Sequence, residues 1–373
     1  MFIEVERNII EDAVKNSSES LLNHSAEVLL QLALAVQRGA HVVLVSSILD
    51  KTYKQLFEKL SEIIGKRYVD LFRGVSERRT FWGPISQHIN KKVVITLDTK
   101  RKSSETEIII NPNVLSDFHF EQETVLLAEN LLDAEFFKHL VLYYKKQHQL
   151  SGAKAEYYAS NGGGATLHQV LTYEMNLLHH FCIAITDSDK CYPNAKQKEY
   201  GTTYKDALKA HKKYNQYNTS ILYVMKNVSE IENLIPHSIL GKHLLCNEKH
   251  IYWERKEMSF YDIKFGLKAK TLYEQAVYNY WVALFPEINF AEVQKLRSKI
   301  KRKDDYCIAI EEKGINDIVP MYWGKDILST AVKKEKVALE NVTIKELTSA
   351  QQIEWNAIGE NLFTWACGLK SKI

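Results

Sequence analysis

The chain has 373 residues, with 49 lysines and arginines against 46 aspartates and glutamates, which gives a formal net charge of +3. A balance this even carries no general signal for nucleic acid, so any such site has to come from local patches. Apolar residues make up 45% of the chain and charged residues 25%, values typical of a globular protein. The length suggests two or three domains, and the composition argues against a disordered or fibrous chain.

Cysteine spacing and the N-terminal sequence bear on the cellular setting. The five cysteines form no C-x-x-C and no zinc-type spacing, which argues against a disulfide framework and favours a reducing, cytoplasmic environment. The first residues, MFIEVERNIIEDAV, contain early acids and no apolar core, so we predict no signal peptide. The most apolar stretch, residues 28–49, is interrupted by polar and basic side chains, so we predict no membrane span.

Residues 1–120 are predicted to form a small N-terminal α+β domain. Apolar residues at spacings of three and four predict a helix over residues 21–35, with Ser17, Ser18 and Ser20 as candidate N-caps. A second helix is expected over residues 51–64. Short β-rich runs predict strands at 40–47, 91–98 and 106–115.

Residues 121–255 alternate between strand and helix patterns, and residues 256–373 are predicted to be a mostly helical C-terminal extension. In the middle part, the expected strands are 124–130, 155–160, 181–189 and 220–227, and the expected helices are 131–147, 161–175 and 202–215. Strand–helix–strand order with apolar strands predicts an α/β domain with a parallel sheet. In the last part, helices are expected at 270–285 and 351–369.

Acidic residues follow the predicted strands of the middle part. Glu129 ends the first strand and Asp133 follows it, Asp187 and Asp189 end a later strand, and Glu230 and Glu232 follow the last one. In an extended segment, Asp187 and Asp189 would point to the same side. Because the carboxyl ends of parallel strands meet at one edge of a sheet, we expect these acids to converge there.

A convergent group of carboxylates repels itself unless a cation neutralises it. Hard oxygen ligands suit Mg²⁺ or Mn²⁺ rather than zinc, and the typical chemistry of such a pair of ions is in-line attack on a phosphodiester. A single D-x-D is common and usually lies in a solvated turn. The ordered series of strand, acid, glycine turn and D-x-D is what favours a metal site.

That series resembles the TOPRIM domain, the topoisomerase–primase fold that also occurs in OLD-family nucleases and in TOPRIM effectors of anti-phage systems, PARIS-type effectors among them. The matching segments are VLLAENLLDAEFF, YYASNGGGATLHQV, IAITDSDK and EIENLIP, and together they cover roughly a third of the chain. Asn130 departs from the family pattern, in which glycine often follows the glutamate and permits a close turn. Asn is the next residue best tolerated in such a backbone.

The resemblance implies a Rossmann-like core and a role for each acid. Asp187 and Asp189 would bind the main metal, and Glu129 would be a ligand or the general acid/base. Asp133, with Glu230 or Glu232, would complete a second metal position. It further implies a nuclease acting on DNA or RNA, tRNA included, controlled by an ATPase. Because the chain has no G-x-x-x-x-G-K-[ST], that ATPase would be a partner protein.

Basic residues near these acids are candidates for contact with a nucleic-acid backbone. Lys190 follows the D-x-D directly, and the helix over 202–215 carries Lys205, Lys209, Lys212 and Lys213 among Tyr204, Tyr214 and Tyr217. The lysines can hold phosphates and the tyrosines can stack bases, although a solvated helix face is an equally good interpretation. Residues 299–303 and 73–102 form two further basic patches.

Two other functions remain open from the sequence. A D-x-D also binds Mn²⁺ in nucleotide-sugar glycosyltransferases and nucleotidyl transferases, although Glu129 and Asp133 have no place in that pattern. A TOPRIM fold can also act as a non-catalytic scaffold that binds a partner or nucleic acid. The sequence leaves the oligomeric state open, a homo-oligomer included, as well as the choice between DNA and RNA.

Overall fold

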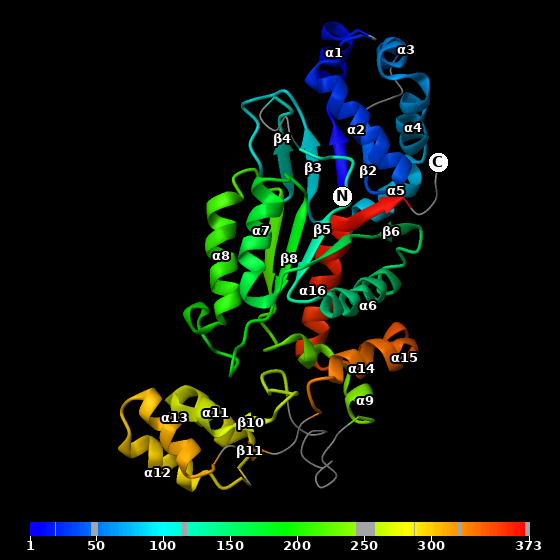
Figure 1. The fold of residues 1–373 in the computed structure, drawn as a ribbon. Coiled ribbons are helices and arrows are strands. Elements are labelled where there is room, and N and C mark those ends of the chain that lie inside the picture. The colour runs from blue at the N-terminus through cyan, green and yellow to red at the C-terminus, as the bar shows by residue number, and fades with distance from the viewer. Residues whose placement is uncertain are drawn as a thin grey trace. The chain divides into compact units, whose positions relative to one another are not determined.

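A computed structural model gives the fold (Figure 1) and describes residues 1–18, 20–45, 51–113, 118–243, 258–286, 288–315, 317–319 and 323–369. Contacts between residues divide the chain into two compact units. The first unit contains residues 1–185, 206–223 and 356–373, and the second contains residues 186–205 and 224–355. The expected strands at 40–47 and 106–115 lie partly outside the described residues.

The first unit begins with a four-stranded sheet in the order β2-β1-β3-β4, in which every pair is parallel. The strands are β1 (Phe2–Val5), β2 (Val42–Val45), β3 (Lys92–Ile95) and β4 (Glu107–Ile110). The helices are α1 (Arg7–Asn16), α2 (His24–Arg38), α3 (Lys51–Ile64), α4 (Lys66–Glu77) and α5 (Arg79–Ser86). Parallel neighbours require long crossover connections, which these helices provide between β1, β2 and β3. This part is therefore α/β rather than the expected α+β.

The start of α2 differs from the sequence-based expectation. The N-cap is Asn23, whose side-chain oxygen accepts a hydrogen bond from the backbone N–H of Ala26. Ser17 does not cap the helix itself; its hydroxyl donates to the Asn23 side chain at 2.8 Å. The prediction of a serine cap was wrong because asparagine is an equally good N-cap and lies directly before the first helical residue.

The second sheet has the order β7-β5-β8-β9. Its strands are β5 (Val125–Ala128), β7 (Tyr158–Asn161), β8 (Cys182–Thr186) and β9 (Ser220–Val224). β5 pairs in parallel with β7 and β8. The N–H of Cys182 donates to the Thr219 carbonyl and the N–H of Met225 donates to the Thr186 carbonyl, so β9 runs in the same direction as β8. The predicted parallel sheet is confirmed.

Helices cover this sheet on two sides (Figure 1). η1 (Gly164–Thr166) leads into α7 (Leu167–Asn176), and α7 packs with α8 (Thr202–Tyr214) over one face, where Leu171 and Ala207 meet Leu127 and Ala184. α6 (Leu131–Gln147) and α16 (Ser349–Ala366) lie on the other side. A Cβ at Gly359 would lie 2.6 Å from the Tyr144 Cβ, so α16 packs directly against α6.

The predicted helix over residues 351–369 ends earlier than expected, at Ala366. Residues Cys367–Leu369 form β12, which pairs antiparallel with β6 (Ala153–Ala155). A Cβ at Gly368 would lie 2.1 Å from the Gly39 carbonyl oxygen, so this backbone approach requires glycine. The change from helix to strand depends on that remote contact, which the local apolar pattern does not report.

The second unit is mostly helical. Its aromatic core includes Trp281, Tyr261 and Trp355, all almost fully buried. The two short strands β10 (Leu267–Lys268) and β11 (Asp317–Val319) pair antiparallel. Its elements are η2 (Gln197–Glu199), η3 (Ile231–Leu234), α9 (His237–Leu240), β10 (Leu267–Lys268), η4 (Ala269–Tyr273), α11 (Gln275–Leu284), α12 (Ala291–Lys299), α13 (Lys303–Glu312), β11 (Asp317–Val319), α14 (Ile327–Lys334), α15 (Lys336–Glu340) and η5 (Ile344–Glu346).

In the part of the chain that the structure describes, no helix is both long enough and apolar enough to cross a bilayer.

Candidate functional site

The segment after β8 carries the two aspartates of the D-x-D sequence. Asp187 accepts a hydrogen bond on Oδ1 from the backbone N–H of Ile231 at 3.0 Å. Between the aspartates, Ser188 is fully buried and its hydroxyl donates to the Val228 carbonyl at 2.7 Å. The D-x-D is thereby tied to the segment that follows β9.

Asp189 does not continue the extended backbone that the sequence analysis assumed. Its φ is +51°, in the left-handed region that aspartate tolerates better than most residues. The N–H groups of Ser188 and Asp189 both donate to the Ser229 carbonyl, which turns the chain at this point. The expectation that the two aspartates project to one side of an extended strand was therefore wrong.

The Asp189 carboxylate lies so close to Gly201 that only a residue without a side chain fits there. A Cβ at Gly201 would lie 1.8 Å from Oδ2 of Asp189 and 2.8 Å from its Cγ. The N–H of Gly201 donates to the Ser188 carbonyl at 3.0 Å, which holds the two segments at this separation. Any larger side chain at position 201 would displace the carboxylate.

Glu230 and Glu232 share one counter-ion, Lys264. The Lys264 Nζ lies 2.8 Å from Oε2 of Glu230 and 3.3 Å from Oε1 of Glu232. Glu230 also begins η3, where its backbone N–H donates to the side chain of Asn233 at 2.8 Å. Sequence reasoning missed Lys264, and no motif marks it, because it lies far along the chain from both glutamates.

Burial and the neighbouring charges shift several pKa values in this group. Burial raises the pKa of Glu232 to about 6, with repulsion from Glu230 adding to the rise and Lys264 opposing it. Burial and the charge of Glu230 also raise the pKa of Asp189. Burial alone would lower the pKa of Lys264, but attraction to Glu232 and Glu230 outweighs burial and raises it.

A further aspartate, Asp262, belongs to the same group. Its Oδ1 accepts a hydrogen bond from the Phe265 N–H at 2.8 Å, and burial together with the charge of Glu230 raises its pKa. Asp189, Glu230 and Asp262 line a small cavity of about 160 Å³ within the second unit. We call it the acidic cavity after these three carboxylates; its lining also contains Lys190 and Lys268, and Lys264 pairs with Glu230.

The donor chemistry of the acidic cavity suits a hard divalent cation, because carboxylate oxygens are the ligands that Mg²⁺ and Mn²⁺ prefer. Among the described residues, however, no three histidine, cysteine or acidic side chains are already arranged to hold a metal ion. Lys264 provides the neutralising charge for Glu230 and Glu232. Within the described part of the chain, the Asp189 carboxylate has no hydrogen bond or ion pair, so both of its oxygens are available to a cation.

Glu129 and Asp133 belong to the first unit. Glu129 is half-buried directly after β5, and its carbonyl accepts a hydrogen bond from the Gly164 N–H at 3.3 Å. Asp133 is buried and forms a capping box with Asn130 at the start of α6, with both hydrogen bonds at 3.0 Å. The Asn130 φ is −145°, so asparagine is present as the helix cap rather than as a substitute for a positive-φ glycine.

The predicted nucleic-acid lysines differ in their surroundings. Lys190 is buried; its ammonium donates to the Lys226 carbonyl at 2.8 Å and lies over the rings of Phe260 and Tyr200. The burial of its ammonium group favours a structural role for Lys190. On α8, Lys209, Lys212 and Lys213 are exposed and Lys205 is half-buried.

The tyrosines of α8 are less available than expected for base stacking. Tyr204 is buried, and its hydroxyl accepts a hydrogen bond from Gln197. Tyr214 packs against the core between α7 and the sheet, and Tyr217 packs against the larger core of the first unit. The expectation that Tyr204 is available to stack bases was wrong, because its ring is part of the protein interior.

Comparison of the chain with protein-family models, with curated proteins and with solved structures found no match.

Proposed function

We propose that this chain is a divalent-metal-dependent nuclease with a TOPRIM-like core, which cleaves phosphodiester bonds in DNA or RNA. The observation that supports the proposal most strongly is the position of the acids in the sheet order. Glu129 comes directly after β5 and Asp187 directly after β8, and these strands are adjacent and parallel. Ligand and catalytic residues of α/β proteins typically follow the carboxyl ends of such strands.

Within this proposal, Asp187 and Asp189 provide the principal metal ligands, and Glu129 exchanges the proton of the attacking water. Bound Mg²⁺ or Mn²⁺ would supply neutralising charge and lower the pKa of that water. The hydrogen bond from Ile231 fixes Asp187, and the close approach of Gly201 fixes Asp189. Lys264 keeps Glu230 and Glu232 in place, and a metal role for either glutamate or for Asp133 stays a prediction.

The proposed setting is a cytoplasmic anti-phage effector that is controlled by an ATPase partner. This part of the proposal depends on the family resemblance of the sequence alone. It has one practical consequence: the isolated chain can be inactive until its partner releases it, so cleavage is measured both alone and with co-purified proteins.

The test is cleavage of labelled DNA and total RNA in Mg²⁺ or Mn²⁺ by wild type, by Asp187→Asn/Asp189→Asn and by Glu129→Gln. We expect each variant to lose activity roughly a hundredfold or more, because each removes a group that acts at the reacting phosphate. Glu311→Gln/Glu312→Gln removes two exposed acids of α13 and is the matched control. Cleavage that persists in the Asp187/Asp189 double variant would contradict the proposal.

The non-catalytic scaffold is the second candidate, and the Lys264 ion pairs favour it. A carboxylate group that is already neutralised by an ammonium needs no metal for stability. This candidate predicts that wild type binds neither Mg²⁺ nor Mn²⁺ and that Asp187→Asn/Asp189→Asn leaves partner binding unchanged.

A further inference from the structure

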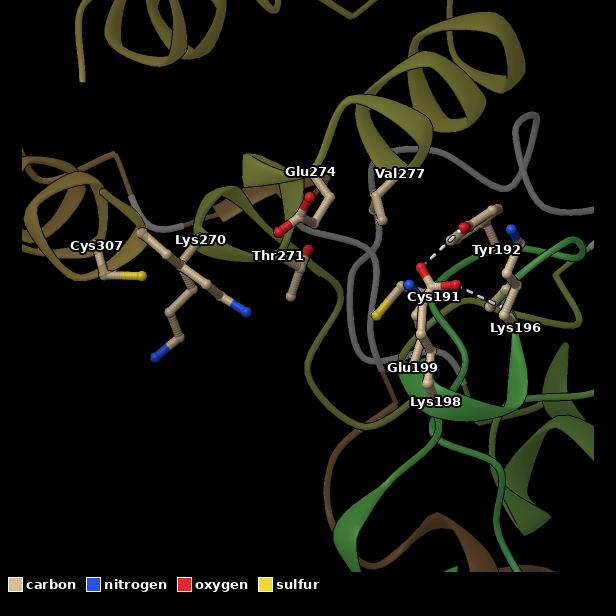
Figure 2. Close-up of a pocket in the computed structure, with 12 residues that line it drawn as sticks. Cys191, Tyr192, Lys196, Lys198, Glu199, Lys270, Thr271, Glu274, Val277 and Cys307 are labelled. Carbon is tan, nitrogen blue, oxygen red and sulfur yellow. Dashed lines mark hydrogen bonds between the residues drawn. The ribbon is translucent and has the colours of Figure 1, made fainter. Parts of the chain in front are cut away.

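A second cavity of the second unit is lined by lysines. Its volume is about 770 Å³, within the range of roughly 300–1,000 Å³ that is typical of ligand pockets. Figure 2 shows two walls: the segment with Tyr192, Lys196 and Lys198 forms one, and η4 with Lys270 and α13 with Cys307 form the other. We call it the lysine cavity; its lysines are Lys196, Lys198, Lys270 and Lys303.

The charge of the lysine cavity is positive. All four lysines are exposed, and none forms an ion pair with any residue that the structure describes. Of the two acids in the lining, Glu199 is already engaged, since it accepts hydrogen bonds from the Tyr192 hydroxyl at 3.0 Å and the Lys196 N–H at 2.7 Å. Glu274 is the other acid. The lining therefore carries four ammonium groups and two carboxylates, a combination that favours an anionic ligand.

The lysine cavity adjoins the acidic cavity. Cys191 and Thr271 line both, and both lie within the second unit. A ligand held by the lysines would therefore extend toward Asp189, Glu230 and Asp262. A ligand that is anionic along its length and also reacts at an acidic metal site is a polynucleotide.

We propose that the lysine cavity binds the sugar-phosphate backbone of a single nucleic-acid strand, whose next segment enters the acidic cavity. This inference deepens the proposed nuclease function and rests on it. The lysines are distributed over both walls rather than converging on one point, which suits successive phosphates better than one small anion (Figure 2). The ring of Tyr192 in the same lining provides a surface on which a base can stack.

The test measures binding of a fluorescently labelled single-stranded DNA, and of an RNA of the same sequence, in EDTA so that no cleavage occurs. The variant is Lys196→Glu/Lys270→Glu/Lys303→Glu, whose exposed positions leave the fold unaffected. The control is Lys333→Glu/Lys334→Glu/Lys345→Glu, which makes the same charge change at exposed positions outside the cavity. We expect the cavity variant alone to bind at least tenfold more weakly. The slope of log K against log salt should fall by about 2, since each single-strand phosphate contact contributes about 0.7.

Equal loss of binding in the two triple variants would overturn the inference, as would wild type that binds no strand. Lysine-dependent binding of a mononucleotide without binding of a strand would also overturn it. A different pair of results would contradict the nuclease function and not the strand site. Lysine-dependent strand binding, together with no metal-dependent cleavage alone or with partners, would leave the strand site in place and remove the catalytic function. If the cavity variant binds the strand as tightly as wild type and cleaves it at the same rate, the lysine cavity is not the strand site, and the nuclease proposal is unaffected.

Discussion

Gly201 is the residue on which the position of the Asp189 carboxylate most directly depends. In Gly201→Ala, the new Cβ would overlap Oδ2, and the flexible carboxylate would move because the backbone is held by the bond to Ser188. We expect Mn²⁺ affinity to fall by roughly 10–100-fold, the usual effect of disturbing a group that positions a ligand. The midpoint of urea unfolding should stay close to that of wild type.

Gly83→Ala is the control for this substitution, because nothing lies within 4 Å of a Cβ at that helical position. It should leave metal affinity unchanged. Unchanged Mn²⁺ affinity in Gly201→Ala would show that Asp189 is not a ligand, because its carboxylate cannot keep its present position beside an alanine.

Glu232 should make the stability of the protein depend on pH. Its pKa is raised to about 6 in the folded protein from 4.5, so the folded state binds more protons than the unfolded state between these values. The contribution of Glu232 to the free energy of unfolding is therefore fully present below pH 4.5 and is lost as the pH rises through about 6. The change is on the order of 2 kcal/mol.

Glu232→Gln removes this titration, so the stability of the variant relative to wild type should increase between pH 4.5 and 7.5. Urea unfolding of both proteins across this range measures the difference. If the variant instead loses stability relative to wild type as the pH rises, the attraction of Lys264 outweighs burial and the sign of the shift is wrong.

At the scale of single elements, the start of α6 depends on the capping box of Asn130 and Asp133. Asn130→Ala should lower the free energy of unfolding by about 1 kcal/mol, because the N–H of Asp133 loses its acceptor. Asp133→Asn should change it much less, since an amide oxygen can still accept from the Asn130 N–H. Equal losses in the two variants, measured by denaturant unfolding, would contradict the capping role.

The short strand β12 depends on Gly368. In Gly368→Ala, the Cβ would lie 2.1 Å from the Gly39 carbonyl oxygen and 3.1 Å from that of Ala40, and neither backbone atom can move without disturbing the turn after α2. We expect a loss of about 2 kcal/mol or more in thermal unfolding, in the range of overpacked cores. Stability equal to that of wild type would mean that β12 does not lie beside this turn.

Elements with strong local patterns were predictable from the sequence. α3 and α6 agree with their predicted limits. Buried apolar residues recur at helical spacing in α3, and Asn130 marks the start of α6 as its N-cap. β5, β8 and β9 were predictable as continuous apolar runs. β1 was missed because a four-residue strand at the start of the chain carries too short a pattern.

For the whole molecule, the sequence predicted the parallel sheet and the acids that follow its strands, but not the pairing of charges around them. Asp262 and Lys264 come from one segment and Gly201 from another, and only the fold brings them to Glu230 and Asp189. The burial of Lys190 was not predictable for the same reason, since it depends on Phe260 and Tyr200. Long-range contacts of this kind leave no periodic signal in a single sequence.

The most direct test of the proposed metal site is a calorimetric titration of the full chain with Mn²⁺, which requires neither a substrate nor an activating partner. Wild type and the Glu311→Gln/Glu312→Gln control should bind Mn²⁺ with the same affinity. Asp187→Asn/Asp189→Asn should bind at least tenfold more weakly. Wild type that binds no Mn²⁺, or a double variant that binds it as tightly as wild type, would contradict a metal-dependent nuclease.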